Sequence, residues 1–283
     1  MKRPLAMQKD FEQIGTIQDL TSIFEAIASI HISQIKDKVV SSTAFFNELW
    51  GVYSKLRVSQ EEDAKLSIQR NGRTALVAVA SEGGLIGDID ERIIQGVLSV
   101  YPGGTPDVFV IGAHGAAILA QKGTRAKQVF AAPDLEKGDS IRQLAEVLGA
   151  YEHAIVYYQT YVSLMRQDIA RIDLFSAVQK LGEVNEINTD VISSRTYILE
   201  PSAEEIVQYL ESVMVGIALG QIVLESKLAQ YASRFNAMYA AKSKAGELRD
   251  DLGLQLHRAK RAAIDERTRE ILSGRKAIQR GGG

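Results

Sequence analysis

The sequence predicts an α/β protein in which the N- and C-terminal helices form a long antiparallel coiled coil and the middle of the chain forms a central α/β domain. Both ends carry long stretches whose apolar side chains recur at steps of three and four residues, as on one face of a helix. The middle alternates short strand-like runs with helical patterns, which favours βαβ units and a mostly parallel sheet. These patterns divide the chain into residues 1–66, 73–200 and 203–283.

The first segment is expected to form one proline-free helix from about Lys9 to Arg57. One stripe of this helix is apolar, and it consists of Ile14, Ile17, Leu20, Phe24 and Ile27. A helix of about 48 residues is too long for a small globular domain to cover. We therefore expect its apolar stripe to pack against the other terminal helix.

The central segment contains strand-like runs separated mostly by turn signals and helical patterns. The strand-like runs are Thr74–Ala80, Asp107–Gly112, Lys127–Ala131, His153–Tyr158 and Val191–Leu199, with Ile172–Phe175 as an additional short piece. The helical patterns are Ile89–Val100, Gly115–Gln121 and Ser140–Ala150. This order predicts a Rossmann-like domain with helices packed on a mostly parallel sheet.

The last segment is expected to be helical from Ala203 to about Gln279. Pro201 precedes it, and Ser202 with Glu205 forms a candidate capping box. Two heptad-spaced seams follow along this helix. The first consists of Leu224, Leu228, Tyr231, Phe235 and Met238, and the second of Ala241, Ala245, Leu248, Leu252, Gln255, Ala259 and Ala262.

Composition excludes several classes of protein. The 283 residues have a formal net charge of -2, which argues against a dedicated nucleic-acid binder. The chain has no cysteine, which excludes disulfide frameworks and thiol nucleophiles, and its four histidines lie far apart. The longest uncharged helical stretch, Ser212–Leu224, is shorter than a membrane span needs. Any link to a membrane is therefore expected to be indirect.

Two turns lie where ligand loops would be found in such a domain. Ser81–Asp88 follows a strand and precedes a helix, but it matches neither G-x-G-x-x-G nor the ending of a P-loop. A tight structural turn is the favoured interpretation and a ligand loop is the alternative. The same holds for Ile111–Gly115. His114 in that turn is a candidate base, although no nearby sequence supplies a serine or aspartate of triad character.

Two groups of carboxylates are candidates for binding a hard cation. They are Glu61, Glu62 and Asp63, and Asp88, Asp90 and Glu91. Their spacing is not that of a calcium-binding loop, which favours solvated turn residues. The sequence therefore predicts no catalytic residue, no cofactor and no metal site.

Charge is distributed unevenly between the two ends. From His257 to Arg280 there are eight basic side chains and three acidic ones, a net charge of +5. From Asp10 to Lys36 the net charge is -3, since this stretch contains four carboxylates and one lysine. A solvated helical face explains this equally well as a tip that meets acidic partner surfaces, where charge would set orientation.

The C-terminal residues resemble the γ subunit of F-type rotary ATP synthases. The resemblance is carried by Arg234–Met238, His257–Ile264 and Glu270–Gly274, and it runs without a gap from about Ala229 to Ile278. Weaker similarity covers most of the remaining chain. It includes Tyr197–Pro201, which is similar to a Y-x-x-E-P element, and Ser81–Gly87, which is similar to an S-D-x-G-L-x-G turn.

Several positions depart from the family pattern and mark a divergent member. Gln18, Ser22, Glu25 and Ala28 stand where the family's first helix carries basic residues. His257 replaces an asparagine of the C-terminal motif, and Lys260 with Arg261 replaces an arginine–glutamine pair. Leu228, Ala229 and Gln230 replace an A-S-E sequence.

The resemblance implies a non-catalytic central rotor shaft. Such a shaft couples ion flow through a membrane ring to ATP synthesis or hydrolysis in a hexamer of α and β subunits. The other implied partners are the ε subunit and the ring of c subunits, and the implied location is the cytoplasmic face of a bacterial membrane, reached through the complex. By position, the residues that would meet the hexamer are Arg258, Lys260, Arg261, Asp265 and Arg267. Tyr197 and Glu200 would face the ring.

Two other functions remain open at this stage. One is a coiled-coil adaptor, or a shaft of an F-type-like ATPase with a task other than ATP synthesis. The other is a nucleotide-binding enzyme built on the central domain.

Overall fold

The computed structural model of the chain describes residues 4–58, 72–100, 106–132, 139–175, 200 and 202–281. The chain divides into two compact units. The sheet unit is Ala28–Arg234, and the terminal unit consists of Met1–Ile27 and Phe235–Gly283. The predicted boundary at residue 66, the cluster Glu61–Asp63, the strand Val191–Leu199 and Tyr197 lie outside the described residues.

Within the described residues, the sheet unit contains five strands in the order β3-β2-β1-β4-β5. Their bounds are Thr74–Val79 for β1, Asp107–Ile111 for β2, Gln128–Phe130 for β3, His153–Tyr161 for β4 and Gln167–Asp173 for β5. All pairs except β4–β5 are parallel, and Val77 of β1 stands between Phe109 of β2 and Val156 of β4. The mostly parallel sheet predicted from the alternating pattern is therefore confirmed.

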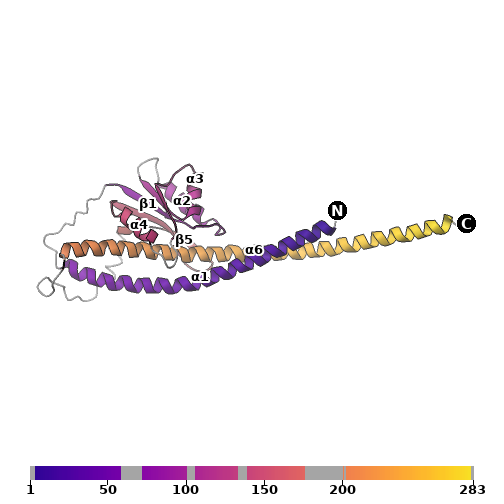
Figure 1. Ribbon diagram of the computed structural model, residues 1–283, viewed down its shortest axis with the longest axis horizontal. Coiled ribbons are helices and arrows are strands. Elements are labelled where there is room, and N and C mark those ends of the chain that lie inside the picture. The colour runs from indigo at the N-terminus through magenta and orange to yellow at the C-terminus, as the bar shows by residue number, and fades with distance from the viewer. Residues whose placement is uncertain are drawn as a thin grey trace. The chain divides into compact units, whose positions relative to one another are not determined.

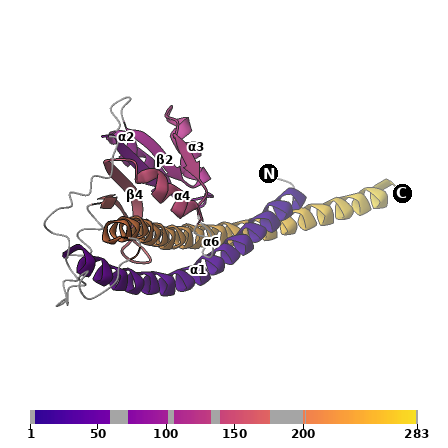
Figure 2. The same cartoon turned by 60° about the vertical axis from the view of Figure 1, so that its left-hand side comes forward.

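Helices cover both faces of this sheet. Helices α2 (Ile89–Ser99) and α3 (Ala113–Gln121) pack on the face that carries Leu76, Val108 and Tyr157. Helix α4 (Asp139–Leu148) and the first part of α6 (Ala203–Gly281) pack on the opposite face. Figures 1 and 2 show α2 and α3 on the far side of the strands from α6. Because both faces are covered, β1 is buried along nearly its whole length.

The fifth strand is the part of the sheet that the sequence predicted least well. The pattern indicated only a short piece at Ile172–Phe175, whereas β5 begins at Gln167 and pairs antiparallel with β4. The turn between them contains no glycine or proline. It is closed by backbone hydrogen bonds, in which Ser163 N–H donates to the Arg166 carbonyl at 3.0 Å and Arg166 N–H donates back at 3.2 Å. A turn without these residues gives no sequence signal.

The two long helices, α1 (Pro4–Val58) and α6, run antiparallel within each unit. Ser202 caps α6 as predicted, since its hydroxyl accepts a hydrogen bond from Glu205 N–H at 3.2 Å. One stretch of α6, within Ser212–Arg275, is apolar and long enough to cross a membrane by length and composition alone. In the sheet unit its apolar side chains Met214, Leu219 and Val223 are instead buried in the core. That stretch therefore serves as a core helix.

The prediction that the apolar stripe of α1 packs against the other terminal helix is wrong. Ile17, Leu20, Phe24 and Ile27 are 39–50% exposed. The positions that α1 buries in the terminal unit include Met7 and Thr21, which lie fourteen residues apart on one heptad seam. A helix facing a single helix buries only such a narrow seam, so the wider stripe beside it stays exposed.

The second predicted seam of α6 is half correct. Ala245 and Ala259 are buried as expected, but Leu248 is 42% exposed and Gln255 is exposed too. The intervening contacts come one residue later, at Arg249 and at the buried Leu256. The face that meets α1 is therefore rotated away from the leucine-rich side.

Candidate functional site

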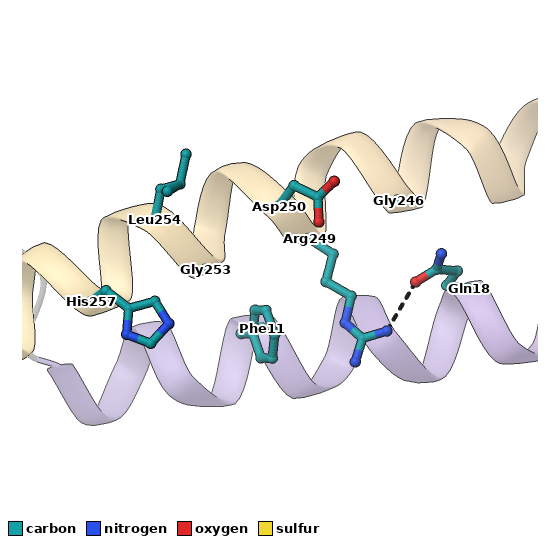
Figure 3. Close-up of a pocket in the computed structure, with 8 residues that line it drawn as sticks. All are labelled: Phe11, Gln18, Gly246, Arg249, Asp250, Gly253, Leu254 and His257. Carbon is teal, nitrogen blue, oxygen red and sulfur yellow. Dashed lines mark hydrogen bonds between the residues drawn. The ribbon is translucent and has the colours of Figure 1, made fainter.

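In the terminal unit, α1 and α6 approach each other closely at two glycines of α6. A Cβ atom on Gly253 would lie 3.3 Å from the ring of Phe11, and one on Gly246 would lie 3.4 Å from Nε2 of Gln18. These two glycines are seven residues apart on α6, as Phe11 and Gln18 are on α1. Figure 3 shows both side chains directed at the backbone of α6. Each glycine thus accepts one side chain from the partner helix, which lets the two backbones approach closely.

Arg249 fixes the register of this pair. Its guanidinium donates a hydrogen bond to Oε1 of Gln18 at 3.1 Å and lies 5.2 Å from the ring centre of Phe11. Phe11 and Gln18, the two α1 side chains that pack on these glycines, therefore both contact Arg249 (Figure 3). An ion pair between Lys242 and Glu25, at 2.9 Å, lies further along the seam. A groove of about 620 Å³, lined by Phe11, Gln18, Gly246, Arg249, Asp250, Gly253, Leu254 and His257, opens beside these contacts.

The five residues assigned to the hexamer contact all point to solvent in the isolated chain. They are Arg258, Lys260, Arg261, Asp265 and Arg267. Among the residues that the structure describes, none of these five forms an ion pair. Apolar side chains share this exposure, because Ile264 and Ile271 are each 64% exposed. The C-terminal part of α6 thus presents charged and apolar groups together. Glu200 is also exposed.

The turns Ser81–Asp88 and Ile111–Gly115 meet at one buried carboxylate. Asp90, in the first turn of α2, is 1% exposed. It accepts a hydrogen bond from the Ser81 hydroxyl at 2.6 Å and contacts Nδ1 of His114 at 2.9 Å. The structure therefore supplies the serine and aspartate that the sequence around His114 lacks. The carboxylate lies between the other two, however, so no serine–histidine bond forms and the group lacks the order of a catalytic triad.

The carboxylates near the start of α2 do not gather into a cation site. Asp90 points inward, whereas Glu91 pairs with Lys122 at 3.3 Å on the surface. Asp88 precedes the helix without making a side-chain cap. Within the described ranges, no three histidine, aspartate or glutamate side chains are placed to share a metal ion.

Two further charged clusters shape the sheet unit. Burial raises the pKa of Glu225 on α6, and burial together with the nearby Glu225 raises the pKa of Tyr158 to about 12. Asp107 begins β2 and accepts hydrogen bonds from Tyr151 at 2.6 Å and Lys127 at 2.8 Å. Burial by itself raises the pKa of Asp107, but these hydrogen bonds and the nearby cations outweigh it and hold the pKa below its usual value.

Comparison with known proteins gives one consistent family. The family model described as ATP synthase matches residues 6–278. The "ATP synthase gamma chain" of Flavobacterium psychrophilum is 26% identical over 279 residues, which covers 94% of this chain and 95% of that one. The gamma chain of Geobacter sp. is 26% identical over 287 residues, covering 97% and 98%. That of Desulfitobacterium hafniense is 27% identical over 277 residues, covering 94% and 95%.

Solved structures share the fold. A chain of the mitochondrial ATP synthase of Euglena gracilis, in rotational state 3, aligns with a TM-score of 0.64 at 14% identity and covers 98% of this chain and 95% of its own length. A chain from the central stalk and c-ring of the Tetrahymena thermophila mitochondrial ATP synthase aligns with a TM-score of 0.59 at 16% identity, covering 78% and 99%. The predicted combination of terminal helices and a central α/β domain is therefore confirmed.

Proposed function

This chain belongs to the ATP synthase family, and from that premise we infer that it serves as the central shaft of a rotary ATP synthase, without catalytic activity of its own. The resemblance to γ subunits drawn from the sequence is confirmed. A shaft works by its shape and its surface, because the chemistry takes place in the subunits around it.

The observation that carries this function is the surface of the terminal unit. Its two helices bury only a narrow seam, which includes Met7, Leu256 and Ala259. They leave many apolar side chains outside it: Ile17, Leu20, Ile23, Phe24 and Ile27 on α1, and Leu254, Ile264, Ile271 and Leu272 on α6. Exposed apolar surface of this extent is typical of interaction sites. A helix pair that turns inside a ring of subunits needs an outer face of this kind.

The partners follow from the family. We propose that the terminal unit lies inside a hexamer of α and β subunits and that the α/β domain rests on the c-subunit ring beside the ε subunit. Similar chains occur in assemblies described as central stalk and c-ring, which supports these partners. The chain would then be peripheral to the membrane, on the cytoplasmic face of a bacterial cell, and attached only through the complex.

We propose particular contacts within this arrangement. Lys260 and Arg261, with Asp265, Arg258 and Arg267 around them, would grip loops of the β subunits. Their exposure supports this role, since long charged side chains on a helix face are free to meet acidic loops of a partner. Tyr197 and Glu200 would face the ring.

Rotation of a probe fixed to the α/β domain tests the function directly. The chain has no cysteine, so Gln121→Cys at the exposed end of α3 provides a unique attachment site. In a complex with α and β subunits held on a surface, we expect ATP to drive rotation of the probe in one direction. A complex that hydrolyses ATP while the probe stays still would contradict the shaft function and favour a coiled-coil adaptor.

The same assay tests the grip residues. We expect Lys260→Glu with Arg261→Glu to lower the torque of rotation without unfolding the chain, because both side chains are exposed. Lys122→Glu with Arg125→Glu makes the same change in net charge on the exposed surface of the α/β domain and serves as the matched control. Unchanged torque in the first variant would remove these two residues from the contact with β.

A further inference from the structure

The carboxyl edge of the sheet between β1 and β4 is where an α/β domain of this topology would hold a ligand. The strand order β3-β2-β1-β4-β5 places β2 on one side of β1 and β4 on the other. The crossovers therefore reverse direction between β1 and β4. Such a reversal opens a crevice at the carboxyl ends of parallel strands, and this is the general ligand site of open α/β sheets.

A polar network with a buried centre fills this crevice. The Asp90 carboxylate accepts hydrogen bonds from the backbone N–H and the hydroxyl of Ser81, at 3.1 and 2.6 Å, and from Nε2 of Gln159 at 3.0 Å. Asp90 and Gln159 are 1% and 0% exposed. A buried carboxylate is stable only when it is surrounded by donors in this way.

Gln159 connects this network to α6. Its Oε1 atom accepts hydrogen bonds from the hydroxyl of Ser226 and from Nε2 of Gln230, and both of these residues are buried. The amide has one possible orientation, because its NH₂ group must face the carboxylate and its oxygen must face the two donors. One turn further on, the Ser233 hydroxyl donates to the carbonyl of Ile86 at 2.6 Å. The helix is thus bonded to β4 and to the loop after β1.

The neighbouring backbone donors are occupied as well. The Glu82 carboxylate accepts a hydrogen bond from Ala113 N–H, at the start of α3, at 3.1 Å, and another from Ala132 N–H. The N-terminus of a helix at this edge would otherwise favour a ligand phosphate. At this helix N-terminus a side chain of the protein itself therefore takes the place that an anion could occupy.

We propose that this crevice is a socket for the chain's own helix, in which Gln159, Ser226 and Gln230 fix the rotation and the axial register of α6 on the sheet. The proposal rests on the function as a central shaft: torque applied to the helix reaches the α/β domain only if the two turn as one body. The apolar contacts of Met214, Leu219 and Val223 hold the helix on the sheet, but because such contacts are non-directional they do not fix its register. If α6 slid by one turn, about 5.4 Å, other apolar side chains could replace these contacts. Every buried donor and acceptor of the network would instead lose its partner.

Hydrogen exchange of the full chain tests the socket without requiring rotation. We expect Gln159→Leu to speed amide exchange in residues 222–234 of α6 about tenfold, because Asp90, Ser226 and Gln230 each lose a partner. Gln230→Leu is the milder variant, and it keeps the test valid if Gln159→Leu does not fold. Gln255→Leu, on an exposed face of the same helix, is the matched control and is expected to exchange at the wild-type rate. Wild-type exchange in both network variants would overturn the proposal.

A double-mutant cycle separates positioning from general destabilisation. If the two amides act through their mutual hydrogen bond, Gln159→Leu with Gln230→Leu speeds exchange less than the product of the two single effects. If the effects of the two substitutions simply multiply, the two amides act as separate core residues, and the socket proposal would be overturned.

The rotation assay then links the socket to torque. In stalled complexes, a probe on the α/β domain is expected to show a broader angular distribution in the double variant than in the wild type or in Gln255→Leu. An equally narrow distribution would overturn the socket while leaving the shaft function intact. A wild-type complex that fails to rotate would contradict the shaft function, whereas the exchange results would still stand for the socket.

Discussion

Helix α6 meets two different environments in the two units of this protein. In the sheet unit its apolar residues Met214 and Leu219 are fully buried, and Val223 is 2% exposed. In the terminal unit Leu254 is 58% exposed and Ile264 is 64% exposed. The residue types are similar and the helix is continuous. What differs is the surface opposite: a five-stranded sheet with α4 in one unit and a single helix in the other.

The difference shows that hydrophobic periodicity predicts which side chains need burial but not what buries them. A sheet offers a wide apolar face, so nearly every apolar residue of the helix above it is covered. One helix offers a narrow seam, and in the terminal unit that seam combines glycines and polar side chains with one small apolar cluster. The apolar groups left outside the seam are available to partner subunits.

The largest effect is expected where the exposed stripe of α1 is charged. Leu20→Glu with Phe24→Glu should weaken binding to the α and β subunits at least about 100-fold, since burying each such side chain is worth about 1.5–3 kcal/mol. The unfolding free energy of the isolated chain should change little, because both side chains are exposed there. A binding titration and urea unfolding measure the two quantities.

The control for this variant adds the same charge elsewhere on α1. Ala26→Glu with Ser33→Glu places two carboxylates at exposed positions outside the stripe and should bind nearly as well as the wild type. If the stripe variant instead unfolded the isolated chain, the contrast between the two units would be lost.

A pair of identical substitutions on α6 measures the contrast within one helix. Leu219→Ala in the sheet unit should lower the unfolding free energy by about 2–5 kcal/mol, because it leaves a cavity in a packed core. Leu254→Ala in the terminal unit should change it by no more than about 0.5 kcal/mol. Urea unfolding of the isolated chain checks both, and equal losses would show that the terminal unit buries Leu254 after all.

Most of the fold could be predicted from the sequence. The apolar runs of β1 and β2 lie between clear turn signals. The starts of two helices, α6 after Pro201 and α2 at Ile89, were predicted to within one residue. The hairpin into β5 could not be predicted, because its turn at Ser163–Arg166 has no glycine or proline. Its strand is also only half-buried, which weakens the alternation that marks a strand.

The functional surfaces were predictable only in part. The basic tip around Lys260 is visible as a charge asymmetry, and the C-terminal motif identified the family. The buried network was missed, because Asp90 reads as one member of an acidic surface group, and Gln159 and Gln230 lie seventy-one residues apart in the sequence. The available signal was topological: a polar residue near the end of β4, beside the strand where the crossovers reverse.

Glu225, a carboxyl group in the sheet unit, should contribute to the pH dependence of stability. Burial raises the pKa of Glu225 in the folded chain above its value of about 4.3 in an unfolded one. Between the two values the folded state binds the extra proton, so the unfolding free energy falls as the pH rises through this window and stays lower above it. Glu225→Gln should remove this loss. Urea unfolding from pH 4 upward checks it, with Glu247→Gln at the exposed surface of the terminal unit as control. Parallel pH profiles for wild type and Glu225→Gln would contradict the assignment.

The smallest effects are expected at two glycines of α6, and they test how tightly the terminal unit is packed. Gly274 has nothing within 4 Å of the position where a Cβ would lie. Gly274→Ala should therefore gain the full helix preference of alanine, about 0.5–1 kcal/mol, and slow local amide exchange about two- to fivefold. Gly253→Ala gains the same preference, but its new methyl group meets the Phe11 ring at 3.3 Å, and that ring is held under Arg249. We expect exchange around residue 253 to be unchanged or faster. Slower exchange there would mean that Phe11 yields freely and that the glycine seam does not set the spacing of the two helices.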